Sequence, residues 1–179
     1  MTPCSDLHYR RCEPQDETLL RRVAIGCYTP YYHDLWEPGG MAAYLESIYA
    51  PPRIAAELVD PNLRYEIAYL AGEPVGFSKY HFRCDRDEII NAAYLERVYV
   101  APAVIGTGVG RCLIERMIDT ARSQAREWIW LQAMSDAPKP LERYRDMGFT
   151  QCGQHRLELP SVRATKSAML VMRLRLTAG

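Results

Sequence analysis

Three glycines at alternate positions stand between a strand-like run and a helix-like run, at Gly106, Gly108 and Gly110. Glycine has no Cβ, so the backbone of such a loop can approach a ligand closely and turn its N–H groups toward it. The helix that follows adds the positive end of its dipole, and the two features together suit a pyrophosphate. We therefore expect a phosphate-binding loop made of Ile105, Gly106, Thr107, Gly108, Val109, Gly110 and Arg111.

Four interpretations of this loop compete. A P-loop ends in Gly-Lys followed by Ser or Thr, whereas the chain reads Gly110-Arg111-Cys112. A Rossmann fingerprint places two residues before its last glycine and starts from an early parallel strand, and the chain has neither feature. A coenzyme A pyrophosphate loop fits both the spacing and the strand–loop–helix context. A glycine-rich turn with no ligand is the fourth interpretation.

The segment from residue 95 to residue 111 resembles motif A of the GNAT acetyltransferases, in which Q/R-x-x-G-x-G/A follows a strand. Gly106 and Gly108 match the glycines, whereas Ala103 stands at the Gln/Arg position and Ile105 at a position that is frequently Arg. The resemblance implies acetyl-CoA as co-substrate, bound mostly by backbone N–H groups and more weakly than in typical members. The pantetheine arm is then expected to pair like an extra strand with Val98, Tyr99 and Val100.

Residues 128–133 and 141–149 resemble motif B of the same family. Its Tyr-x-x-x-Gly-Phe pattern is matched from Tyr144 onward. An alanine occupies the motif's Asn position, and the neighbouring Asp136 is the polar side chain that we expect near the coenzyme. The match implies that Tyr144 protonates the departing thiolate, because a phenol is neutral near pH 7 and can donate. The alternative is an aromatic side chain packed in the core.

A wider resemblance to the PaiA-type acetyltransferases, which acetylate spermidine and spermine, covers nearly the whole chain. It is carried by residues 41–47, 76–79, 95–100 and 153–155, whereas residues 160–166 lack that family's acidic stretch. The resemblance implies an N-acetyltransferase with a small-molecule amine as acceptor, and a polyamine in particular. A protein N-terminus, a lysine or an amino-sugar are alternative acceptors. A non-catalytic acyl-CoA-binding sensor is a further alternative, suggested by the departures from both motifs.

Acetyl transfer to an amine also needs a proton acceptor, because a primary amine has a pKa near ~10.4 and its neutral form costs roughly 4–5 kcal/mol near pH 7. Glu96 is the candidate, acting directly or through water, just before the glycine loop. Strict alternation places it on the strand face shared with Val98 and Val100. The alternative is a carboxylate that pairs with Arg97 or another charge.

Aromatic and acidic residues between residues 28 and 40 suit the binding of a cationic amine by cation–π and ionic contacts. We expect the acceptor to be contacted by Tyr31, His33, Trp36 and Glu37. The alternative is a hydrophobic lid on the core.

These residues must be positioned by a regular succession of elements. Helical periodicity predicts helices over residues 17–28, 41–49, 51–58, 109–123 and 141–147. Alternation and short apolar runs predict strands over residues 7–12, 65–70, 75–82, 92–100, 128–133 and 169–176. The order predicts an α/β (α+β mixed) protein, and the resemblance implies a GNAT fold with a central mixed, splayed β-sheet flanked by helices. Residues 1–179 are expected to form a single domain.

Composition narrows the function classes. Lys plus Arg and Asp plus Glu both total 22, which argues against a nucleic-acid partner or an anionic membrane. No apolar run approaches the ~20 residues that span a bilayer, and the first residues do not resemble a secretory signal, so we expect a cytoplasmic protein. Six cysteines and four histidines without ligand spacing predict free thiols and no metal site. A homodimer is an open alternative to a monomer.

Overall fold

The computed structural model describes residues 6–176, and a seven-stranded sheet runs through them in the order β1-β2-β3-β4-β5-β7-β6. Its strands are β1 (Leu7–Arg11), β2 (Leu63–Leu70), β3 (Glu73–His81), β4 (Ala92–Val100), β5 (Trp128–Met134), β6 (Thr150–Arg156) and β7 (Ala168–Arg175). β4 and β5 are parallel and the other neighbours antiparallel. The predicted mixed sheet is therefore confirmed.

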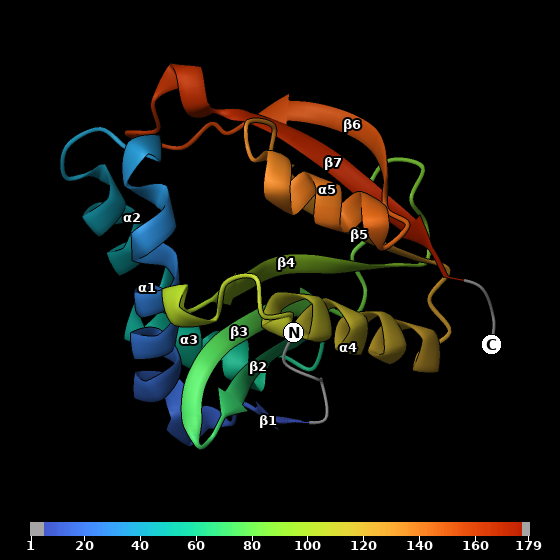
Figure 1. Cartoon of the computed structure of the whole chain (residues 1–179), viewed down its shortest axis with the longest axis horizontal. Helices are drawn as coiled ribbons and strands as arrows, with labels where there is room; N and C mark the ends of the chain where they lie inside the picture. Colours follow the sequence, from blue (N-terminus) through green and yellow to red (C-terminus); the bar gives the residue numbers. More distant parts are fainter. Residues whose placement is uncertain (1–5, 177–179) are drawn as a thin grey trace.

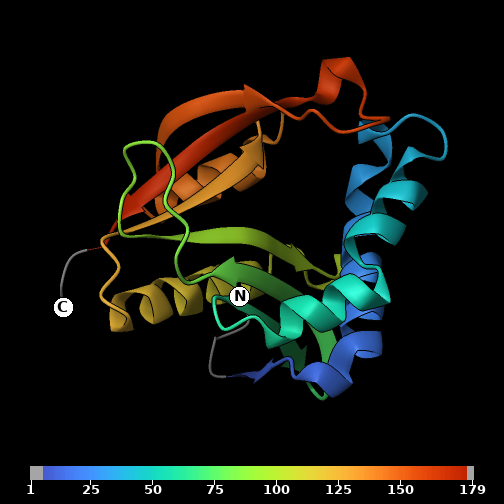
Figure 2. The ribbon, with the colours of Figure 1, turned by 180° about the vertical axis from the view of Figure 1, so that it is seen from behind.

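Helices cover both faces of this sheet (Figures 1 and 2). They are α1 (Glu17–Tyr32), α2 (Gly40–Ile48), α3 (Pro51–Val59), α4 (Val109–Ser123) and α5 (Pro138–Asp146). α4 and α5 lie on one face, and α1 and α3 pack on the other (Figures 1 and 2). α4 keeps its predicted bounds because its apolar residues recur at helical spacing and are buried together.

The sheet splits between β4 and β5. Their parallel pairing extends from Ala92 opposite Trp128 to Leu95 opposite Leu131. Beyond Leu95, β4 continues beside β3, while β5 continues beside β7. The facing edges of the two strands therefore part, which gives the splayed sheet that the sequence resemblance implied (Figure 1).

A β-bulge interrupts β4 at Glu96. In the pairing with β3, Tyr80 lies opposite Leu95 and Lys79 lies opposite Arg97, so no residue of β3 lies opposite Glu96. The extra residue reverses the alternation. Leu95 and the valines after the bulge pack on the α4 side. The prediction that Glu96 shares a face with Val98 and Val100 is therefore wrong, because strict alternation does not hold through a bulge.

Helix α1 continues to Tyr32, beyond the predicted end at residue 28. It includes Pro30, although proline lacks the N–H that a helix interior uses. The rings of Tyr28 and Tyr32 stack at 4.4 Å, and both pack edge-on against Tyr99. This tertiary packing outweighs the local preference.

Strand β6 is missing from the sequence prediction. Its side chains are mostly exposed and show no apolar alternation. β6 lies at the edge of the sheet and is held by main-chain pairing with β7. A strand stabilised mainly by its backbone leaves little hydrophobic periodicity to detect.

Cys12, Cys27, Cys84 and Cys152 are free thiols, but Cys112 is disulfide-bonded. The expectation of a free thiol is therefore wrong at Cys112, since spacing alone carries no pairing information. Within residues 6–176, no helix combines the length and the apolarity that crossing a membrane requires.

Candidate active site

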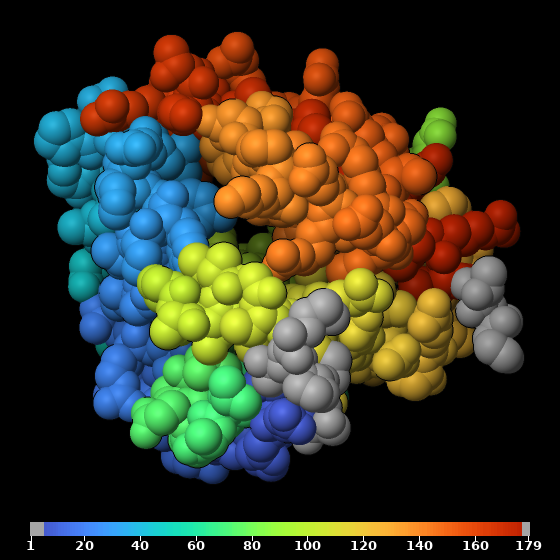
Figure 3. All heavy atoms as spheres, viewed as in Figure 1, coloured from blue at the N-terminus to red at the C-terminus, as the bar shows by residue number. Residues whose placement is uncertain are grey.

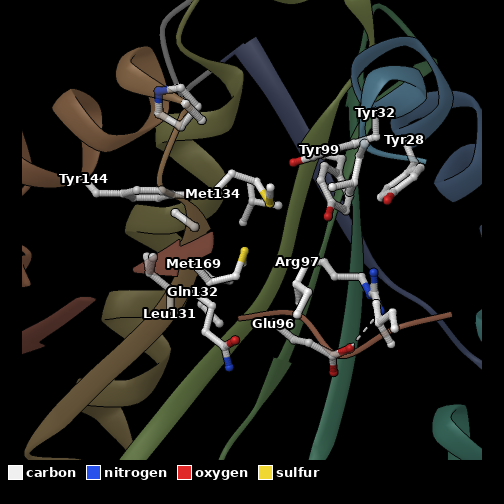
Figure 4. A pocket seen from close by; sticks show the side chains of 18 of the residues that line it. Tyr28, Tyr32, Glu96, Arg97, Tyr99, Leu131, Gln132, Met134, Tyr144 and Met169 are labelled. Carbon is white, nitrogen blue, oxygen red and sulfur yellow. Dashed lines mark ion pairs between the residues drawn. The ribbon is translucent and has the colours of Figure 1, made fainter. Parts of the chain in front are cut away.

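A cavity of about 260 Å³ opens where β4 and β5 part. In Figure 3 its mouth is a hollow between α1, the loop after β4 and α5. β4 and β5 supply its floor, and Tyr28 and Tyr32 of α1 face Tyr144 of α5 across it (Figure 4). The cavity is therefore assembled from residues that lie far apart in the sequence.

The edge of β4 that borders the gap presents main-chain groups that do not pair with β5. The N–H of Ala101 donates to the carbonyl of Val75 at 2.8 Å, so the polar groups of Ala101 and Tyr99 turn toward β3. The main-chain polar groups of Val98 and Val100, which alternate with Tyr99 and Ala101, turn toward the gap. Two of the three strand residues expected to pair with a pantetheine arm therefore have suitable backbones, whereas Tyr99 lines the cavity with its side chain.

The glycine loop leads from this edge to the start of α4. Gly106 and Gly108 have φ values of +78° and +107°, which favour glycine, and Gly108 is the N-cap of α4. The first N–H groups of the helix have no partner within it. No atom beyond the chain neighbours lies within 4 Å of where a Cβ would stand at Gly106. This open cradle of N–H donors fits a phosphate group.

The side chains of the loop contribute less. Ile105 is exposed, and the Thr107 hydroxyl donates to the Val104 carbonyl at 2.7 Å. Arg111 Nε donates to Glu115 Oε1 at 2.7 Å. Any phosphate bound here would therefore meet mainly backbone.

Tyr144 lines the cavity from α5. Its ring packs edge-on against Phe149 at 5.9 Å and points into the cavity toward Met134 (Figure 4). Burial raises the pKa of Tyr144, which keeps the phenol protonated. A neutral O–H in this position can donate a proton.

Asp136, expected beside the coenzyme, lies away from the lining. Its carboxylate accepts a hydrogen bond from Lys166 Nζ at 2.7 Å, and both side chains are exposed. Ala137 and Pro140 line the cavity near this position instead.

Glu96 lies in a compact ion cluster on the floor of the cavity. Its Oε2 is 2.8 Å from Lys79 Nζ and 2.7 Å from His81 Nε2, and its Oε1 is 3.2 Å from a terminal nitrogen of Arg97. Burial alone would raise the pKa of Glu96, but the hydrogen bond from His81 and the charges of Arg97 and Lys79 lower it to about 2. The carboxylate is therefore permanently ionised, and the pairing with Arg97 matches the alternative interpretation of Glu96.

The cluster extends under α3 through the buried Lys79. Lys79 Nζ is 2.9 Å from Glu57 Oε1, and Tyr65 Oη donates a short hydrogen bond to the other oxygen of Glu57. Burial opposes ionisation of Glu57, but the hydrogen bond from Tyr65 and the charge of Lys79 outweigh it and lower the pKa. Sequence periodicity did not single out these residues, because their contact depends on three separate elements.

Aromatic rings form the opposite wall. Tyr28 and Tyr32 of α1, Trp36 and Tyr44 join Tyr99 of β4 there. Trp36 Nε1 donates to Tyr28 Oη at 3.2 Å, and Arg97 donates to Tyr44 Oη at 3.3 Å. The sequence analysis did not place Tyr44 or Tyr99 at the acceptor, because both lie outside the aromatic segment, and it expected Tyr99 beside the coenzyme instead.

Of the four residues expected to contact the acceptor, Trp36 lines the cavity and the other three do not. Tyr31 instead donates its hydroxyl to the Val100 carbonyl at 2.9 Å. His33 begins a short 3-10 helix, and Glu37 is 3.9 Å from Arg163 Nε. The extension of α1 explains the difference, because a helix turns successive side chains to different sides. No group of three metal-binding side chains occurs within the described chain.

Residues 61–151 match the acetyltransferase (GNAT) domain family. The chain is similar to a streptothricin acetyltransferase of Streptomyces lavendulae, at 36% identity over 99 residues that cover 55% of this chain and half of that relative. It is also similar to the crystal structure of a nourseothricin acetyltransferase, at 27% identity and a TM-score of 0.57, over 66% of this chain and 68% of that one.

A PaiA N-acetyltransferase from Thermoplasma acidophilum, solved with coenzyme A, shares the fold more completely. The TM-score is 0.74 over 94% of this chain and 98% of that one, at 16% identity.

Proposed function

The chain belongs to the GNAT acetyltransferase family, and from this premise we propose that it transfers the acetyl group of acetyl-CoA to the nitrogen of a small-molecule amine. The parting of β4 from β5 beside the positive end of α4 carries the proposal. A pantetheine arm needs main-chain partners, and a pyrophosphate needs N–H donors. One continuous segment, residues 98–111, offers both.

The coenzyme is proposed to lie along the free edge of β4. Val98 and Val100 would supply main-chain partners for the pantetheine arm, and the N–H groups from Gly108 to Arg111 would face the pyrophosphate. Ala103 stands at the Gln/Arg position of motif A and has no polar side chain, so the contact with the pyrophosphate would be left to the backbone. The thioester would then reach the cavity between Glu96 and Tyr144.

Tyr144 is proposed as the acid. When the amine nitrogen attacks the carbonyl carbon and the C–S bond breaks, the sulfur keeps the electron pair. The phenol of Tyr144, protonated because burial raises its pKa, supplies the proton that makes the thiol.

Glu96 is proposed to hold the ammonium group of the acceptor rather than to take its proton directly. Moving a proton from an amine with a pKa near ~10.4 to a carboxylate with a pKa of about 2 costs roughly 11 kcal/mol. A fixed negative charge on the floor of an aromatic cavity does suit a cationic group. The acceptor nitrogen would thus start beside Glu96.

Streptothricin is the first acceptor that we propose, because the matches at 36% and 27% identity are to proteins named for streptothricin and nourseothricin. A polyamine is the second candidate. It has less support, since the likeness to the PaiA protein concerns the fold at 16% identity. In addition, Glu96 is the one carboxylate among the described lining residues, whereas a polyamine carries several ammonium groups.

Turnover with a panel of amines tests the proposal. Thiol release from acetyl-CoA is followed with streptothricin, spermidine, an amino-sugar, lysine and a short peptide, and each product is checked by mass spectrometry. We expect release and N-acetylation with streptothricin above the other amines. Tight coenzyme binding with no thiol release on any amine would contradict the proposal and favour an acyl-CoA sensor.

A further inference from the structure

We propose that His81, oriented by Glu96, is the group that accepts the proton which the acceptor amine must lose before it attacks the thioester. This inference rests on the proposed function and adds a proton acceptor to it. The observation behind it is the short contact between His81 Nε2 and Glu96 Oε2, at 2.7 Å.

His81 lies at the open side of the ion cluster. It is the last residue of β3, and its ring stacks on Tyr94, a cavity-lining residue, at 5.7 Å and 23°. The side chain of His81 is 23% exposed, compared with 17% for Glu96 and 3% for Lys79. The imidazole is thus the member of the cluster that can best exchange a proton with solvent.

Glu96 fixes which ring nitrogen of His81 is available. An ionised carboxylate only accepts hydrogen bonds, so the hydrogen in the contact with Glu96 belongs to Nε2 of His81. A neutral imidazole carries one N–H, and its Nδ1 therefore has a free lone pair. A partner on one ring nitrogen that presents the other as a base is a familiar arrangement in proton transfer.

The surroundings of His81 tolerate the added charge. The neighbours of His81 on β4 are Tyr94 and Glu96. On its own strand, Lys79 forms an ion pair with the same Glu96 carboxylate. The residue that pairs with His81 on β2 is the apolar Leu63. The charged group in direct contact with the ring is the carboxylate of Glu96, at 2.7 Å, and it stabilises a proton on the imidazole. With Arg53, which pairs with Glu57, the cluster carries two negative and three positive charges, so this stabilisation depends on the contact with Glu96 and not on the net charge.

His81 lies directly behind the lining residues Tyr94 and Glu96, and the other titratable side chains that line the cavity are poor proton acceptors. Burial raises the pKa of Tyr28 and Tyr94, and it does the same for Tyr32 and Tyr99, so these phenols are protonated near neutral pH. Arg97 is always protonated. Imidazole is the side chain whose charge changes near physiological pH.

The proton balance is complete. One ammonium proton passes through water to Nδ1 of His81, the ring nitrogen turned away from Glu96, and leaves to solvent. The neutral nitrogen forms the C–N bond, the C–S bond breaks toward sulfur, and Tyr144 protonates the sulfur. The second nitrogen proton then restores Tyr144, so the products are the amide, the thiol and one released proton.

The kinetic test compares His81→Gln with wild type, using acetyl-CoA and streptothricin. The glutamine amide can still donate to Glu96 but has no basic nitrogen. We expect kcat/KM to fall by ~10²–10⁴-fold near neutral pH. The deficit should shrink as pH approaches the pKa of the amine, because the amine then arrives neutral. A structural role would instead give a deficit that does not change with pH.

His8→Gln is the matched control. His8 lies on β1 and stacks on Tyr69 at 6.2 Å, far along the sheet from the ion cluster. It should keep wild-type kcat/KM and its pH profile. A His81→Gln enzyme that stays within about threefold of wild type overturns the proposal.

Imidazole ¹⁵N NMR of the free protein gives a readout besides activity. We expect the His81 signals of an Nε2–H tautomer, and a change in them in Glu96→Gln. An Nδ1–H tautomer in wild type overturns the role of His81 but leaves the proposed acetyl transfer intact. Absence of thiol release by wild type on every amine is the distinct result that removes the proposed function, and the role of His81 with it.

Discussion

At the residue scale, the two acids of the cavity are held in opposite protonation states by their neighbours. Tyr144 lies among apolar groups, and burial raises its pKa. Glu96 is also buried, but the hydrogen bond from His81 and two positive charges lower its pKa to about 2. Burial of an acid therefore has no fixed consequence, because charges and hydrogen bonds within a few ångströms decide which form persists.

Tyr144→Phe separates the two roles considered for this residue. The ring and its contact with Phe149 remain while the acidic proton is lost, so unfolding temperature should change little. If the phenol protonates the thiolate, kcat should fall by ~10²–10⁴-fold with a similar KM for acetyl-CoA. Tyr9→Phe is the control, since its buried hydroxyl has no hydrogen-bond partner. Turnover of Tyr144→Phe within about threefold of wild type would reduce Tyr144 to a packing residue.

The ion pairs of Glu96 predict a specific loss of stability in acid. A lowered pKa contributes stability that is present above the ordinary carboxyl range, near ~4.3, and disappears as pH falls toward about 2. Glu96→Gln should therefore cost on the order of 2–3 kcal/mol near neutral pH, and the cost should shrink across that window. Urea unfolding at several pH values measures it.

Glu46→Gln is the matched control for that experiment. Glu46 pairs with Arg21 at the surface, and its side chain is 68% exposed. Such pairs contribute at most about 1 kcal/mol. A Glu96→Gln cost that stayed constant between neutral and acid pH would contradict the ion-pair account.

At the element scale, the sequence predicts what depends on periodicity and local chemistry. The bounds of β4 and α4 are confirmed, because each carries an apolar pattern that meets a proline or a glycine at one end: β4 ends shortly before Pro102, and α4 begins directly after Gly108. The bulge at Glu96 is invisible in that pattern, since it depends on the pairing with β3. The acceptor wall is equally hidden, because Tyr44 and Tyr99 join it only through their ring contacts with Tyr28, after α1 packs on β4.

The glycine loop gives a prediction for the start of α4. Gly108→Ala forces a Cβ into a left-handed conformation at the helix N-cap, where we expect the pyrophosphate. The KM for acetyl-CoA should rise by roughly tenfold or more, which corresponds to about 1.4 kcal/mol. Steady-state kinetics at saturating amine measure the change.

Gly72→Ala controls for backbone strain. Gly72 lies in the β2–β3 turn with φ +84° and open space around it. Because both glycines have a positive φ, each substitution should cost roughly 1–2 kcal/mol of stability. It should leave the KM unchanged. Equal effects of the two substitutions on KM would place the pyrophosphate elsewhere.

At the scale of the whole molecule, one cavity depends on two halves of the sheet. Strands β1 to β4 carry the ion cluster, while β5 to β7 carry the wall that holds α5 and Tyr144. A ligand that lies in the gap would touch both halves. Its binding should therefore stabilise the protein as a unit.

Thermal unfolding tests this expectation and the class of ligand together. At ~100-fold excess over Kd, a ligand adds about 2.7 kcal/mol, which for a chain of this length raises Tm by roughly 5–10 °C. We expect the shift with acetyl-CoA and not with NAD or ATP. Stabilisation by NAD or ATP alone would contradict a coenzyme A site.

The hydrogen bond from Tyr31 to the Val100 carbonyl bears on how that coenzyme binds. The hydroxyl of Tyr31 thus occupies an acceptor that the pantetheine arm would use. Tyr31→Phe removes the competitor, so acetyl-CoA should bind roughly 2- to 12-fold more tightly, the value of one ordinary hydrogen bond. Calorimetric titration measures the affinity, and weaker binding would contradict the competition.

Displacement of Tyr31 would remove one contact of the last turn of α1, which also carries Tyr32 of the acceptor wall. Through this turn, the arrival of the coenzyme would act on the surface that receives the amine. We therefore expect a preferred order of binding, in which the coenzyme enters first, the amine follows, and the thiol is the last product to leave.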